Sequence, residues 1–165
     1  MERSPEVITK SDLRKLLKLA RGNMDSFYKR NPSYNEYKGK EVLVALCQGS
    51  ALHYIDRKTG VKDFDVWFFY PMKSRNLPYR RHGVVDFGKS KFGVHPKAKS
   101  RGYKGRSVDV LIRSDAFCKG KSPESEIVNY LLNKNSATSQ LLAEKAVIGL
   151  YPERLFGKRL WPQKF

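Results

Sequence analysis

Three aspartates, one glycine and one serine are the residues of this chain whose types and spacing are best suited to chemistry. Gly49 and Ser50 follow an apolar run, Asp63 and Asp65 come after a spacer of twelve residues, and Asp109 lies within a second apolar run. Carboxylates bind divalent cations, and a Gly-Ser turn at the start of a helix presents free N–H groups to phosphate. Together, these residues are the parts needed to hold a nucleoside triphosphate on metal ions.

The residues around Gly49 and Ser50 predict a strand, a turn and a short helix. Residues 42–47 form an apolar run of strand length, and residues 51–55 place apolar side chains at helical spacing. Ser50 is a favourable N-cap, and Gly49 allows the backbone to approach a ligand closely. Gly60 is expected to cap the C-terminal end of this helix.

The three aspartates are expected to lie on strands. Residues 61–70 are rich in β-branched and aromatic residues, as strands are, and alternate side chains of a strand share one face. Asp63 and Asp65 should therefore project together. Asp109 interrupts the apolar run 108–112, where an unpaired buried charge would be unfavourable. Magnesium is the usual remedy for adjacent carboxylates, because it binds carboxylate and phosphate oxygens together.

This order of an apolar strand, Gly-Ser, a spacer, Asp-apolar-Asp and a later strand aspartate resembles the polymerase-β-like nucleotidyltransferase superfamily. That superfamily includes minimal nucleotidyltransferases, antibiotic nucleotidyltransferases and enzymes that add nucleotides to tRNA ends. The resemblance covers residues 42–113, less than half of the chain. It implies an α/β (α+β) fold in which helices flank a mixed β-sheet. The roles that it implies are triphosphate binding by Gly49 and Ser50, metal ligation by Asp63 and Asp65, and a position beside the attacking hydroxyl for Asp109.

The activity that the resemblance implies is that of a metal-dependent nucleotidyltransferase. Such an enzyme moves a nucleoside monophosphate from a nucleoside triphosphate, such as ATP, to a hydroxyl group and releases pyrophosphate. Two Mg²⁺ ions are the expected cofactors, with Mn²⁺ as an alternative. Asp63 and Asp65 would bridge the ions, and Asp109 would join them as a ligand and help to lower the pKa of the acceptor hydroxyl. The sequence leaves open whether the acceptor is RNA, DNA, a protein or a small molecule.

The segment between the expected strand of Asp65 and the expected strand of Asp109, residues 71–107, is a long basic insertion. Between Lys73 and Arg106 it contains eleven lysines and arginines against one acid, Asp86. Aromatic residues are interleaved with them, namely Tyr79, Phe87, Phe92 and Tyr103. Basic side chains neutralise phosphates and aromatic rings stack on unpaired bases, so the insertion predicts nucleic-acid binding, with contacts at Arg80, Arg81, Lys97 and Lys99. The alternative is a solvated basic face whose aromatic residues belong to the core.

Residues 83–90 also match the P-loop expression G-x-x-x-x-G-K-[ST]. A P-loop must leave a buried strand and open a helix, whereas residues 75–82 are polar and basic, and Gly93 and Pro96 interrupt residues 91–101. We therefore predict an irregular or hairpin-like segment there instead of a second phosphate site.

The net charge of +17, from 33 basic and 16 acidic residues, indicates a polyanionic partner. The length of 165 residues and an apolar content of 40% predict one globular domain over residues 1–165. Because no apolar run reaches membrane-spanning length and residues 1–5 have no apolar signal core, we expect a cytoplasmic protein without a membrane partner. The oligomeric state is left open.

Helices are expected near both ends of the chain. Residues 11–30 have amphipathic spacing with a basic outer face, and Asn31-Pro32 should end that helix. The C-terminal part, residues 122–165, is predicted to be helical, with one helix starting at Ser122-Pro123 and a second over residues 136–148. The tail from residue 151 is expected to dock on the core.

Two other classes of function remain open. A noncatalytic basic nucleic-acid-binding protein would explain the charge but would leave the three aspartates without a purpose. A metal-dependent nuclease would use similar carboxylates, but it would release nucleotides from nucleic acid without consuming a triphosphate.

Overall fold

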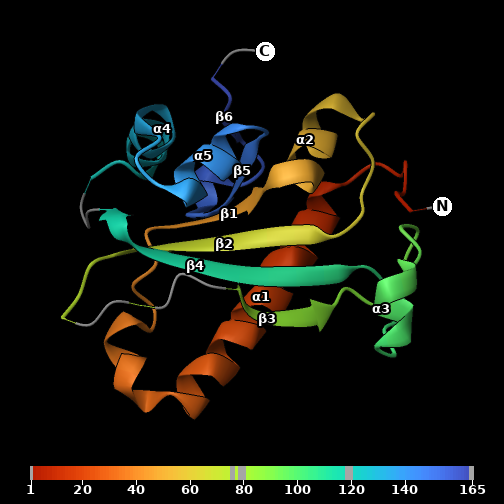
Figure 1. Cartoon of the computed structure of the whole chain (residues 1–165), viewed down its shortest axis with the longest axis horizontal. Helices are drawn as coiled ribbons and strands as arrows, with labels where there is room; N and C mark the ends of the chain where they lie inside the picture. The colour runs from red at the N-terminus through yellow and green to blue at the C-terminus, as the bar shows by residue number, and fades with distance from the viewer. Residues whose placement is uncertain (1, 75–76, 78–80, 118–120, 164–165) are drawn as a thin grey trace.

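The structure is a computed structural model that describes residues 2–74, 77, 81–117 and 121–163. Figure 1 shows a mixed α+β architecture in which helices pack against a six-stranded mixed sheet. The strands are β1 (Leu43–Cys47), β2 (Phe64–Pro71), β3 (Arg81–Asp86), β4 (Ser107–Phe117), β5 (Val147–Tyr151) and β6 (Arg159–Trp161). Their order is β3-β4-β2-β1-β5-β6, and only the β2–β4 pair is parallel among these strands.

The helices of the described residues are α1 (Lys10–Arg30), α2 (Gln48–Asp56), α3 (Pro96–Ser100), α4 (Pro123–Asn133) and α5 (Ala137–Ala143), with 3-10 turns η1 (Pro32–Tyr37) and η2 (Glu153–Leu155). A capping box between Thr9 and Asp12 begins α1, and Asn31 ends it, which confirms the prediction for this helix. Among the described residues, no helix combines the length and the apolar character needed to cross a membrane.

The two faces of the sheet belong to two separate cores. On one face, Phe64 and Val66 of β2 belong to the cluster that includes Leu16 of α1. On the other face, Trp67 and Phe69 belong to the cluster that α4 and α5 cover. The alternation predicted for this strand is confirmed, because successive side chains of β2 enter different cores.

The prediction of a helical C-terminal part, residues 122–165, is wrong beyond residue 143. The second predicted helix, 136–148, ends at Ala143, and Val147 and Ile148 begin strand β5. This segment pairs with β1 on one side and β6 on the other, so non-local pairing overrides its helical pattern. The tail docks on the core through β6, as expected.

Candidate metal and phosphate site

The three aspartates meet at one end of the parallel β2–β4 pair. Asp65 on β2 lies directly opposite Asp109 on β4, whereas Asp63 precedes β2 instead of lying on it as expected. All three side chains are half-buried, and one carboxylate oxygen from each lies within 4.8 Å of the others. The cluster can hold a metal ion.

Burial and like charge act together on Asp65. Burial, followed by the charges of Asp63 and Asp109, raises the pKa of Asp65 well above its ordinary range, and Lys145 opposes this effect. The hydrogen bond with Asp109 raises the pKa of Asp65 as well, because it favours the protonated carboxyl. A divalent cation removes the repulsion that favours this proton. The oxygen-only donor set therefore fits a hard cation such as Mg²⁺ or Mn²⁺.

Helix α2 begins earlier than expected, directly after β1. Its N-cap is Cys47, which makes no side-chain capping bond, and Gln48 turns the chain with a left-handed φ of 64°. The prediction of Ser50 as N-cap is therefore wrong. Ser50 instead lies inside the first turn, and its buried hydroxyl has no hydrogen-bond partner among the described residues. The N-terminus of α2 thus lacks a side-chain cap beside the carboxylates.

The predicted C-cap of α2 is also wrong. The helix ends at Asp56, and Arg57 adopts the left-handed conformation that was expected of Gly60. Gly60 lies in the following loop, also at a positive φ of 83°, where an added Cβ would approach the Cβ of Arg3 to 2.9 Å. Glycine is therefore required there by the close approach of the N-terminal segment.

Two basic residues that the sequence interpretation did not select flank Gly49. A Cβ atom added at Gly49 would lie 3.6 Å from Nη1 of Arg3 and 3.8 Å from Nζ of Lys145. Lys145 reaches this position because β5 pairs with β1, with Val147 opposite Cys47. Arg3 is held by a bridge between Ser4 and Val61. Gly49 therefore lies in a positive environment suited to phosphate.

The basic insertion reaches the carboxylates through α3. A cavity of about 170 Å³ is lined by Asp63 and Asp109 together with Lys97 and Arg101. Lys97, one of the four predicted nucleic-acid contacts, is thus brought to the acids, whereas Lys99 of the same helix is exposed and does not line the cavity. Of the other predicted contacts, Arg80 lies outside the described residues, and for Arg81 only the backbone, at the start of β3, is described.

Aromatic residues of the insertion belong mainly to the core. The rings of Phe87 and Phe92 are buried and lie 5.0 Å and 5.3 Å from the ring of Phe64. The prediction that these two rings stack on bases is therefore wrong. Tyr103 donates its hydroxyl to the Val84 carbonyl, and Tyr79 lies outside the described residues.

Arg106 is a buried cation that links the insertion to the N-terminal segment and to the loop before β2. Its guanidinium donates to the carbonyls of Phe92 at 2.8 Å, Glu2 at 2.7 Å and Lys62 at 3.4 Å. Burial lowers the pKa of Arg106, and the charge of Asp63 opposes that effect. Arg106 thereby fixes the backbone next to Asp63.

The P-loop interpretation of residues 83–90 fails, as predicted. Strand β3 ends at Asp86 and is antiparallel to β4, and α3 does not begin until Pro96. The Asp86 carboxylate accepts hydrogen bonds from the backbone N–H groups of Gly88, Lys104 and Gly105. A carboxylate therefore occupies the space between these N–H groups that a phosphate would need.

Replacing Lys89 by alanine should leave triphosphate affinity within about twofold of the parent, because surface charges act weakly at a distance. Nucleic-acid affinity should fall modestly, by the loss of about one phosphate contact. Titrations with a fluorescent triphosphate and with a labelled oligonucleotide would measure the two effects. A selective collapse of triphosphate binding would restore the P-loop interpretation.

Comparisons of the chain with protein-family models, curated proteins and solved structures gave no match. The function is therefore argued from the geometry of the carboxylates and of their neighbours.

Proposed function

We propose that this chain is a metal-dependent nucleotidyltransferase of the polymerase-β-like kind. It would transfer a nucleoside monophosphate from a triphosphate to a hydroxyl acceptor and release pyrophosphate. The observation that supports this best is the convergence of the Asp63, Asp65 and Asp109 carboxylates beside the uncapped start of α2. A simple nucleic-acid-binding protein has no need to keep three repelling acids together.

The triphosphate would lie on the α2 side of the carboxylates. The first N–H groups of α2, Gly49 and the Ser50 hydroxyl would donate to phosphate oxygens, and Arg3 and Lys145 would neutralise their charge. Lys145 also acts on Asp65, so this cation lies near both Gly49 and the acids. This placement supports the roles expected of Gly49 and Ser50.

Asp63, Asp65 and Asp109 would hold the Mg²⁺ ions, which when bound neutralise the triphosphate and lower the pKa of the acceptor hydroxyl. Asp63 and Asp109 also face the cavity that Lys97 and Arg101 line. An acceptor that carries phosphate would therefore enter from α3, opposite the triphosphate, with its hydroxyl beside Asp109. This two-sided arrangement favours a nucleic-acid acceptor over an uncharged one.

The test is to incubate the protein with each α-labelled nucleoside triphosphate, magnesium and total cellular RNA or protein. Label should appear on nucleic acid as pyrophosphate is released, and the Asp65→Asn protein should transfer none. Label on protein would change the acceptor assignment. Degradation of nucleic acid without any triphosphate would favour a nuclease and contradict the proposal.

Replacing Lys145 by alanine should weaken triphosphate binding about tenfold or more, because a charged hydrogen bond to phosphate contributes about 1.5–3 kcal/mol. The structural role of Lys145 is small, since its side chain is exposed. Lys158→Ala, another exposed lysine on the C-terminal segment, is the matched control and should bind as the parent does. Equal affinities of the two variants for a fluorescent triphosphate would remove Lys145 from the site.

A further inference from the structure

A basic groove of about 750 Å³ runs along α1 and is bounded on one side by Val85 of β3. We call it the α1–β3 groove. Its lining includes the cations Arg14, Lys15, Lys18 and Arg30, and it includes no carboxylate among the described residues. Arg14 pairs with Glu153, and Lys15 lies over the ring of Phe87, while Lys18 and Arg30 are exposed. The groove therefore presents positive charge to solvent.

The open floor of the groove depends on a glycine in the middle of α1. Gly22 is exposed, and a Cβ atom added there would meet nothing within 4 Å. Glycine destabilises the interior of an exposed helix relative to other residues, so packing does not explain its presence. A larger side chain at this position would project into the groove and fill part of it, so glycine keeps the groove open.

The insertion contacts α1 next to the groove. Nζ of Lys15 lies 4.2 Å from the centroid of the Phe87 ring, and Nζ of Lys91 lies 3.1 Å from an Asp12 oxygen on α1. The insertion thus packs against the first turns of α1. It then leads into α3, whose Lys97 and Arg101 line the cavity at the acids. Figure 1 shows β3 ending beside α3.

We propose that the α1–β3 groove binds the sugar-phosphate backbone of a single-stranded nucleic acid, which serves as the acceptor of the proposed reaction. The role of this nucleic acid as acceptor rests on the proposed function, but its binding to the groove can be tested separately from nucleotide transfer. From Arg14 to Arg30 the helix rises about 24 Å, which suits a repeating anion. No aromatic ring is among the described lining residues, so we expect little sequence preference.

An acidic amphipathic helix fits the groove less well. Recognition of a helix requires apolar anchors at successive turns, and the aliphatic side chains lining the groove are Leu19 and Val85. The four cations among the described lining residues match phosphates better than they match apolar anchors of this kind.

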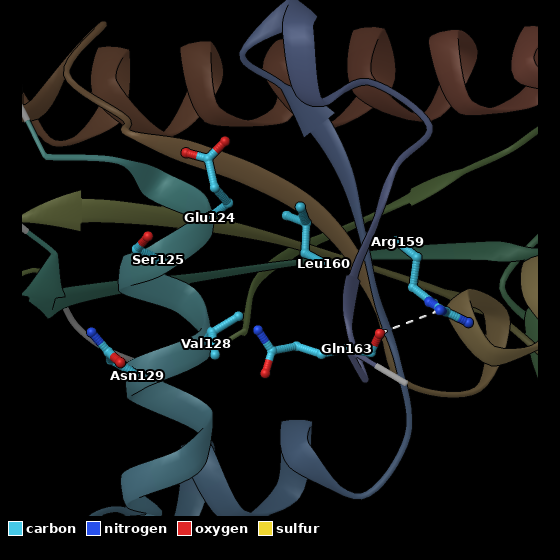
Figure 2. Close-up of a pocket in the computed structure, with 7 residues that line it drawn as sticks. All are labelled: Glu124, Ser125, Val128, Asn129, Arg159, Leu160 and Gln163. Atoms are coloured by element: carbon cyan, nitrogen blue, oxygen red, sulfur yellow. Dashed lines mark hydrogen bonds between the residues drawn. The ribbon is translucent and has the colours of Figure 1, made fainter. Parts of the chain in front are cut away.

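The cavity shown in Figure 2 provides a comparison within the same chain. It has about 570 Å³, and α4 and the β6 segment face each other across it. Its lining includes both an acid, Glu124, and a cation, Arg159. Because its charges are balanced, it should not bind a polyanion.

Binding should be measured on the metal-free full chain, by fluorescence anisotropy with a mixed-sequence single-stranded RNA of about 15 nucleotides. The double variant Lys18→Glu/Arg30→Glu should bind about tenfold or more weakly, and the slope of log K against log salt should flatten by about 1.4, or 0.7 for each lost contact. Lys121→Glu/Lys158→Glu makes the same change in charge at exposed positions outside the groove. That control should bind within about threefold of the parent.

An uncharged variant separates the groove from general charge effects. Gly22→Leu should weaken RNA binding several-fold while raising the melting temperature by about 2–4 °C, because leucine is the better helix former. Ser125→Leu, on α4 in the cavity of Figure 2, should not change RNA binding. The melting temperature of the Gly22→Leu protein also shows whether misfolding could account for a loss of RNA binding.

The proposal is overturned if both groove variants bind RNA as the parent does, or if the control pair loses as much affinity as Lys18→Glu/Arg30→Glu. It is also overturned if an acidic polyglutamate peptide displaces the RNA at equal concentration, because the groove would then suit an acidic protein partner. Loss of binding in the groove variants, together with no transfer by the parent, would support the groove while contradicting the proposed function.

Discussion

The Asp65→Asn protein should lose magnesium-dependent transfer by at least about a hundredfold, because removal of a metal ligand eliminates charge stabilisation in the transition state. Asparagine keeps the shape of the side chain, so the fold should remain intact. Transfer from an α-labelled triphosphate under single-turnover conditions would measure the loss, with circular dichroism to check the fold. Asp63→Asn should behave similarly. Activity above about a tenth of the parent would contradict the assignment of these residues as metal ligands.

The same substitution should change the pH dependence of stability in the metal-free protein. The folded state raises the pKa of Asp65, so it binds that proton more tightly than the unfolded chain does. The parent should therefore lose stability as pH rises above the ordinary aspartate pKa of about 3.9 and through the raised folded value. Asp65→Asn should lack this loss and be the more stable protein at neutral pH without metal. Magnesium should then stabilise the parent more than the variant.

Replacing Arg106 by leucine should have the largest effect on stability. The substitution leaves the buried carbonyl of Phe92 and the partly buried carbonyls of Glu2 and Lys62 without this donor. The expected loss is about 3 kcal/mol, which corresponds to a fall in melting temperature of roughly 6–12 °C. Because Arg106 holds the backbone beside Asp63, magnesium affinity should fall as well. Thermal unfolding with and without magnesium would measure both effects.

Two further substitutions control this prediction. Arg106→Lys should recover only part of the stability, because a lysine ammonium cannot reproduce the planar geometry of a guanidinium that serves several carbonyls. Lys104→Leu, at an exposed neighbouring position, should unfold at nearly the parent temperature. If Arg106→Leu unfolded at the same temperature as Lys104→Leu, Arg106 would not hold this part of the structure together.

The sequence predicted the parts of the site that depend on local pattern. Strand alternation around Asp65 and Asp109 was readable because apolar neighbours mark the core side of each strand. The direct opposition of these two residues was not readable, since it depends on pairing across the whole insertion. The alternation of side chains along one strand tells which residues share a face of the sheet. Which residue lies opposite which depends on how the partner strand is aligned, and the sequence does not show that alignment.

The rest of the site depends on non-local contacts. Lys145 follows a segment with helical spacing, and only the pairing of β5 with β1 brings it to Gly49. Arg3 has no local signal at all. Phe87 and Phe92 show the opposite problem, because an aromatic residue among lysines has the same pattern whether it stacks on bases or enters the core.

The distribution of the site along the chain has a consequence for synthesis in the cell. Segments that lie far apart in sequence contribute the residues of the site, namely Arg3, Gly49, Asp65, Asp109 and Lys145. Strand β1 has a partner on its second edge only after β5 has paired with it. A nascent chain on the ribosome therefore cannot assemble the site until Lys145 has left the exit tunnel. Until then, the edge of β1 is open to incorrect partners, so chaperone capture should be strongest in that interval.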